Sequence, residues 1–111
     1  MEIEVQDSDG AMVIALIGEL VARSEQATIL DLVAEKLKNG VKVFVLDLSE
    51  VPYISSLGIA VLVSTYVKVN REGGTLRLVN PRPRVAHVLD LTKVADIFKS
   101  YTSVEEALTE V

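Results

Sequence analysis

The chain has 111 residues, of which half are hydrophobic and 24% are charged, with a formal net charge of −5 and no cysteine. This length and balance fit one globular domain, and the lack of cysteine excludes disulfides and thiolate metal ligands and fits a reducing cytoplasm. The negative charge argues against nucleic-acid binding, and no apolar stretch reaches the ~20 residues that a membrane-spanning helix needs.

The N-terminal residues predict a β-hairpin. Ile3 and Val5 alternate with polar residues, which is the two-residue period of a half-buried strand. Polar residues that favour tight turns follow at positions 7–10, and a second apolar run covers 12–17 before Gly18. We therefore expect two antiparallel strands at the start of the chain, joined by a short turn.

A helix and a buried strand are expected next. Ser24 is suited to cap a helix in which apolar residues recur at helical spacing as far as Leu37, and Asn39-Gly40 provides its end. The run Val41–Leu48 is dense in β-branched and large apolar residues, which is typical of a strand covered on both faces. Pro52 then prevents the strand from continuing.

A second, longer helix is expected after the connector that contains this proline. It should begin at Ser55 or Ser56 and run to about Glu72, before a pair of glycines ends it. Because its residues are apolar on most sides as far as Lys68, we expect the helix to be largely buried.

The remaining residues predict two more helices and two short strands. In chain order we expect a strand at Thr75–Val79, a helix at Val85–Leu91, an extended piece around Ile97–Phe98 and a last helix after Ser103. Ser103 and Glu106 form a capping box, in which each side chain bonds to the other residue's backbone amide. The element order predicts an α/β fold: a mixed, mostly parallel sheet of four to five strands, about four helices and a β-hairpin at the N-terminus.

The sequence shows no pattern typical of catalysis or metal binding. His87 is the only histidine and is expected on the third helix, and the acidic residues lack calcium-loop spacing. Neither a phosphate-binding glycine loop nor a nucleophile elbow is present. We therefore expect no enzyme, no cofactor and no metal, with an unfamiliar enzyme and a nucleotide-binding module kept as alternatives.

The connector before the second helix is the most informative segment, because ligands gather beyond the carboxyl ends of parallel strands. One of its two serines, Ser55 and Ser56, would cap the helix. Alternatively, a phosphate on one of them would lie at the positive end of the helix dipole, where the fold tolerates it but a docked partner would not. Asp47, near the end of the preceding strand, is expected to support this site. The apolar part of a docking surface is expected from Tyr53, Ile54 and Leu57.

Several segments also stand in a recognisable order and spacing. They are Gly18-Glu19-Leu20, Val43–Ser49 with its final Asp-Leu-Ser, Tyr53–Ile59, Gly74–Pro81, Val88–Thr92 and Glu105–Leu108. Together they resemble the STAS domain family, in particular the bacterial anti-sigma factor antagonists, over nearly the whole chain. The resemblance implies the STAS-like fold and a single domain over residues 1–111.

The resemblance also implies a function and a set of site residues. Ser56 falls on the family's phosphoacceptor serine, with Ser55 as the alternative acceptor. The unphosphorylated protein would bind an anti-sigma factor that is also a serine kinase of the GHKL type, and would so free a sigma factor. Phosphorylation would release this kinase. A PP2C-like phosphatase would restore the serine. The implied partner-binding residues are Val21, Arg23, Tyr53, Ile54, Ser55, Leu57 and Gly58. The protein would be a cytoplasmic regulator of transcription, monomeric or weakly dimeric.

Three positions differ from the family pattern. Ser55 stands where an aspartate usually precedes the acceptor, Val21 stands where an aspartate often follows the Gly-Glu-Leu element, and Leu57 replaces a serine or threonine. The first two differences remove negative charge from the expected partner surface. They favour an alternative, in which the chain is a STAS subunit of a transporter or of a sensory complex and has no phosphorylation switch.

Overall fold

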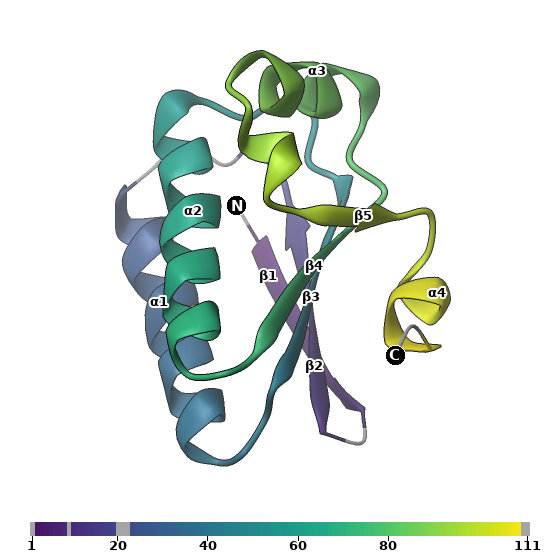
Figure 1. Cartoon of the computed structure of the whole chain (residues 1–111). Helices are drawn as coiled ribbons and strands as arrows, with labels where there is room; N and C mark the ends of the chain where they lie inside the picture. The colour runs from purple at the N-terminus through teal and green to yellow at the C-terminus, as the bar shows by residue number, and fades with distance from the viewer. Residues whose placement is uncertain (1, 9, 20–22, 110–111) are drawn as a thin grey trace.

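Strands and helices alternate along most of the chain in the computed structural model (Figure 1). The structure describes residues 2–8, 10–19 and 23–109, and at residues 23–27 and 99 it describes the backbone alone. Within these ranges the elements are β1 (Glu2–Ser8), β2 (Ala11–Ile17), α1 (Arg23–Lys38), β3 (Val43–Glu50), α2 (Ser56–Arg71), β4 (Thr75–Val79), α3 (Pro83–Leu91), the 3₁₀ helix η1 (Val94–Asp96), β5 (Lys99–Tyr101) and α4 (Val104–Thr109). The predicted α/β fold and its N-terminal hairpin are confirmed.

The strands lie in the sheet in the order in which they occur in the chain. β1 pairs antiparallel with β2, and β2, β3, β4 and β5 follow as parallel neighbours. Each helical connection between parallel strands therefore leads to the adjacent strand, always on the same side. Connections that share one handedness place their helices on one face of the sheet. Figure 1 shows this result: α1 and α2 lie side by side on one face, and α4 lies on the other.

The central strands are buried on both faces, which explains their nearly continuous apolar sequences. The face toward α1 and α2 carries the larger core, with fully buried side chains at Ile14, Leu16, Phe44, Leu46 and Leu48. The opposite face carries a smaller cluster formed by Val13, Val45, Val79, Tyr101 and Ala107. The sheet is thus covered completely on one side and in part on the other.

A buried arginine holds α4 against the second face. Arg77 of β4 is only 9% exposed, and its Nη1 donates a hydrogen bond of 2.6 Å to the carbonyl of Ala107. Its guanidinium also lies 5.9 Å from the ring centroid of Tyr101. A cation at the last turn of a helix bonds favourably to the carbonyls that have no partner within the helix.

The strand predicted at Val41–Leu48 lies two residues later, at β3. Val41 does not join the strand because its amide donates to the carbonyl of Lys36 and closes the end of α1. At the other end, Glu50 pairs with Ile17 beyond a register shift that places one extra residue in β3, and its carbonyl accepts from the amide of Gly18. Pairing with a neighbouring strand therefore extends β3 into polar residues that looked like a connector.

The C-terminal third shows three further differences. The third helix begins at Pro83 instead of Val85, since proline suits the first turn of a helix, where its missing amide costs nothing. The extended piece predicted around Ile97–Phe98 lies at β5, and the preceding residues form η1, which the sequence did not indicate. β5 has only three residues, too few for a sequence period to be recognised.

Two predicted helix caps also differ from expectation. The amide of Glu106 donates to Ser103 Oγ at 3.1 Å as expected, but the Glu106 carboxylate accepts from the amide of Thr102 at 3.3 Å instead of that of Ser103. α1 begins at Arg23, so Ser24 lies inside the first turn and not at the cap. The existence of both helices is nevertheless confirmed.

Candidate functional site

The candidate site lies at the edge of the sheet where β3 and β4 end. The connector 51–55 leads from β3 to α2, and residues 80–82 lead from β4 to α3, so the starts of both helices meet at this edge. Figure 1 shows α3 above the sheet beside the start of α2. The sequence predicts the site at this edge, and in the structure two connectors come together there.

The two adjacent serines have different surroundings. Ser55 is the N-cap of α2: its backbone is extended, and its Oγ accepts a hydrogen bond of 3.2 Å from the amide of Gly58. Ser56 is the first residue of the helix and is exposed to solvent. Because Ser55 provides the cap, the hydroxyl of Ser56 is not required for this structural task.

We expect Ser55→Ala to lower the free energy of unfolding by about 1 kcal/mol, since the amide of Gly58 loses its acceptor. Ser56→Ala, which changes an exposed hydroxyl in the same turn, is the matched control and should change stability by less than about 0.5 kcal/mol. Urea unfolding followed by circular dichroism measures both. Equal losses for the two variants would contradict the assignment of the cap.

Two arginines from the start of α3 contact the connector. Arg82 Nε donates to the carbonyl of Ser49 at 2.8 Å, and its guanidinium lies 3.9 Å from the carboxylate of Glu50. The guanidinium of Arg84 lies over the ring of Tyr53, 5.5 Å from its centroid. The second contact is a cation–π interaction on an exposed aromatic side chain.

Sequence reasoning missed both arginines, although a signal for them exists. Neighbouring parallel strands end at the same edge, so the residues that follow β4 must lie beside those that follow β3. The sequence of Asn80–Pro83 predicts only a turn before a helix. We call Tyr53, Ser56, Leu57 and Arg84 the α2-start surface.

Three residues expected at the site lie elsewhere. Ile54 is 1% exposed and belongs to the core under α2, and Gly58 is buried in the first turn, so neither presents a side chain to a partner. Asp47 lies on the opposite face of the sheet, where it lines a hollow with Glu4 and Val104. Its carboxylate accepts the amide of Ser49 at 3.0 Å, so it supports the start of the connector and does not point toward Ser56.

The other predicted partner-binding residues are placed as follows. Tyr53 is 40% exposed and Leu57 is half-buried, so both present apolar surface. Arg23 begins α1, and its side chain, like all of Val21, lies outside the described residues.

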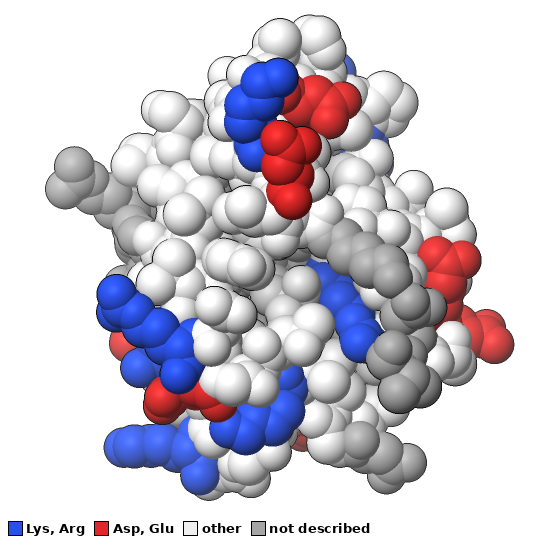
Figure 2. Space-filling model, viewed as in Figure 1, with Lys and Arg blue, Asp and Glu red and all other residues white. Residues whose placement is uncertain are grey.

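The surface around the start of α2 carries few charges. The sequence has no charged residue between Glu50 and Lys68, and the first turn of α2 contains no acidic side chain. In Figure 2 the upper half of α2 is white, with charged groups above and below it. α2 buries one side, including Val61 and Leu62, and leaves Ser56 and Val67 exposed, so it is less enclosed than its composition indicates.

The described residues 2–8, 10–19 and 23–109 show neither a metal site nor a membrane span. There, no group of three or more histidine or acidic side chains is arranged to hold a metal ion. Nor is any helix in these ranges both long and apolar enough to span a bilayer. His87 lies on α3 as predicted and is exposed.

Comparison with known proteins gives a consistent result. The STAS domain matches residues 2–107. A protein from Thermotoga neapolitana named as an anti-sigma factor antagonist is 39% identical over 77 residues, which cover 69% of this chain and 68% of the relative. The anti-sigma F factor antagonist of Paenibacillus polymyxa is 24% identical over 111 residues, 100% of this chain and 95% of the relative. A crystal structure from Thermotoga maritima, named likewise as an anti-sigma factor antagonist, has a TM-score of 0.82 at 26% identity and covers 98% of this chain and 93% of its own.

Proposed function

Because this chain belongs to the STAS domain family, we propose that it is an anti-sigma factor antagonist controlled by phosphorylation of Ser56. Its relatives carry that name, and one of them aligns with it over its whole length. In the proposed role the protein works in the cytoplasm, binds an anti-sigma factor of the GHKL serine kinase type and catalyses nothing itself. Capture of this partner frees a sigma factor, and a PP2C-like phosphatase reverses the modification.

The proposal rests on one difference between the two serines: one of them caps the helix and the other does not. Ser55 caps α2 through Gly58, whereas Ser56 is exposed one residue later. A kinase can therefore reach the Ser56 hydroxyl without removing the helix cap. This arrangement supports Ser56 over Ser55 as the acceptor.

The start of α2 would tolerate the modified residue. The kinase would transfer the γ-phosphoryl group of ATP to Ser56 Oγ, releasing ADP and the hydroxyl proton. The product carries a charge of about −2 at neutral pH and lies at the positive end of a 16-residue helix whose first turn has no acidic side chain. We therefore expect the modified protein to stay folded.

The same charge would disrupt a docked partner. Tyr53 and Leu57 flank Ser56 with uncharged surface, so a partner that packs on them must exclude water from this place. A phosphate in such an interface would lose its hydration, which costs several kcal/mol unless the partner supplies a cation to it. One modification would thus end binding without unfolding the domain.

The test is phosphosite analysis of the protein isolated from its native cells, with the partners identified in the same pull-down. We expect a phosphate on Ser56 in a fraction of the molecules, and a GHKL-type kinase associated with the unmodified fraction. A chain in which Ser56→Ala has been introduced should carry no phosphate and should retain the kinase. A protein that is never phosphorylated and that copurifies with a transporter or a sensory scaffold would overturn the proposal in favour of the alternative without a switch.

A further inference from the structure

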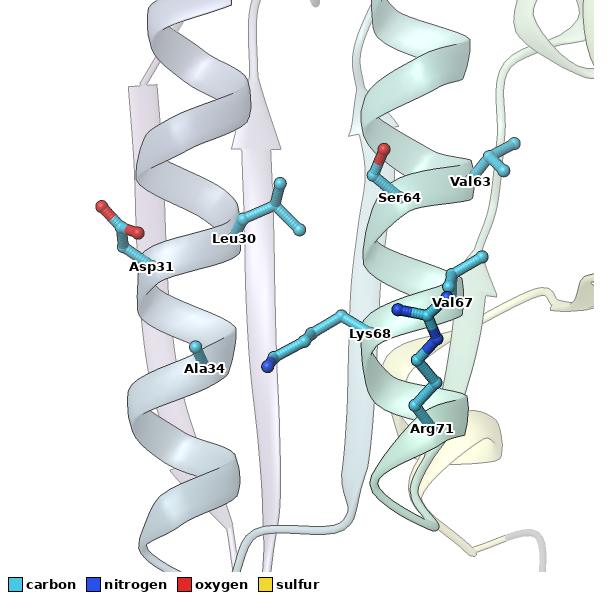
Figure 3. A pocket seen from close by; sticks show the side chains of 8 residues that line it. All are labelled: Leu30, Asp31, Ala34, Val63, Ser64, Val67, Lys68 and Arg71. Carbon is cyan, nitrogen blue, oxygen red and sulfur yellow. The ribbon is translucent and has the colours of Figure 1, made fainter.

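A groove open to solvent runs between α1 and α2, away from the α2-start surface. It has a volume of about 480 Å³, and its apolar lining comes from both helices: Leu30, Ala34, Val63 and Val67. Two basic residues of α2, Lys68 and Arg71, complete it together with the polar residues Asp31 and Ser64. In Figure 3, Leu30 and Lys68 point toward one another across the groove, whereas Asp31 points away from α2.

The groove is separated from Ser56 along the helix. Val63, Val67 and Arg71 follow one another at four-residue intervals in the second half of α2. At a rise of 1.5 Å per residue, Lys68 lies about 18 Å along the axis from Ser56. A partner segment bound here would therefore leave the α2-start surface accessible.

The charges at the groove are available to a partner. Lys68 and Arg71 are exposed, and the ion pairs found within the described part of the chain involve Lys36 and Arg82 instead. Figure 2 shows several basic groups, with acidic groups between them, at the lower end of the molecule, where α1 and α2 end, although the whole chain has a net charge of −5. The apolar lining of the groove thus adjoins two basic side chains that form no ion pair within the described residues, and the one carboxylate of the lining, Asp31, points away from α2.

We propose that this groove binds an amphipathic helix of a partner protein whose apolar stripe is flanked by acidic side chains. Two neighbouring helices with apolar residues between them form the kind of channel into which the apolar face of a third helix packs. Lys68 and Arg71 would pair with glutamates or aspartates beside that stripe. The proposal does not depend on phosphorylation of Ser56, and it adds a second binding surface to the domain.

The test uses a designed peptide of 16 residues with leucines at helical spacing and glutamates on both flanks, titrated into ¹⁵N-labelled full-length protein at 0.15 M salt. We expect saturable shifts of the backbone amides of residues 30–34 and 63–71. A peptide with lysine in place of every glutamate is the matched probe and should bind at least about tenfold more weakly.

Matched protein variants test the role of the two cations. Lys68→Glu with Arg71→Glu should raise the dissociation constant of the acidic peptide by about tenfold or more. Lys93→Glu, compared with Lys68→Glu alone, makes the same change in net charge at an exposed residue outside the groove, and should change the dissociation constant by less than about twofold because distant charges are screened. Ser56→Asp should also bind the peptide normally, so failure of the proposed phosphorylation switch would leave this result unaffected.

Several results would overturn the proposal. Equal binding of the lysine peptide, shifts that cluster outside the groove, or no shifts at millimolar acidic peptide would each do so. Concentration-dependent shifts of residues 63–71 without any peptide would instead identify a second copy of the chain as the occupant.

Discussion

Ser56→Asp is expected to weaken binding of the anti-sigma kinase by about a hundredfold or more while the domain stays folded. An aspartate places a negative charge on the first residue of α2, which the helix dipole accepts and a desolvated interface does not. The affinity is measured by calorimetric titration of the kinase recovered in the pull-down. Circular dichroism and thermal unfolding report on the fold.

The matched control for this variant is Ser56→Asn, which has nearly the same shape as aspartate and no charge. It should retain binding within about tenfold, so that the difference between the two variants isolates the charge. Two results would contradict the expectation: normal binding by the aspartate variant, or its unfolding. The second would show that the start of α2 does not tolerate the charge.

Gly74→Ala is expected to lower the free energy of unfolding by about 2–3 kcal/mol, because the chain passes very close to itself where α2 turns into β4. A Cβ at this position would lie 2.7 Å from the carbonyl oxygen of Lys42 and 2.9 Å from Cγ1 of Val69. Neither neighbour can easily move: the Lys42 carbonyl accepts the amide of Thr75 at 2.7 Å, and the amide of Gly74 is bonded to the Val69 carbonyl. Denaturant unfolding measures the loss.

Gly73→Ala is the control for Gly74→Ala. Gly73 has a φ of +77°, and a Cβ there would meet no atom within 4 Å. Its replacement is strained only by the left-handed backbone, at a cost of about 1 kcal/mol. If Gly74→Ala lost no more stability than Gly73→Ala, the close approach to Lys42 would not be the constraint that we describe.

The sequence indicated the elements whose periodicity is long enough to be recognised. α2 and the strands β2 to β4 were predicted within a few residues, since their apolar runs are bounded by glycine, proline or polar turns. The strand expected around Ile97–Phe98 lies two residues later, at β5, and η1 was not predicted, because three residues carry no period and β5 depends on pairing with β4. Glu50 was assigned to a connector because its strand pairing is with a residue more than 30 positions earlier.

The candidate site was predictable in position but not in detail. The two serines were expected at the start of a helix beyond the end of a parallel strand, where they lie, yet only the hydrogen bond to Gly58 distinguishes the cap, Ser55, from the exposed Ser56. The burial of Ile54 and the contact between Arg84 and Tyr53 depend on tertiary packing, which local sequence does not specify. Arg77 is a further example, because its strand position is buried by the packing of α4 against that face of the sheet.

The strand order of the sheet also bears on how the protein forms during synthesis. β1 to β5 lie side by side in chain order, so no strand has to be inserted between two others. As the ribosome extends the chain, the N-terminal hairpin can form first, and each later strand then meets an edge that already exists. Synthesis delivers the N-terminal strands first, and unpaired edges in partly folded chains promote aggregation. In the described sheet each new strand pairs with the edge that the preceding strand left open, while the outer edge of β1 stays uncovered throughout.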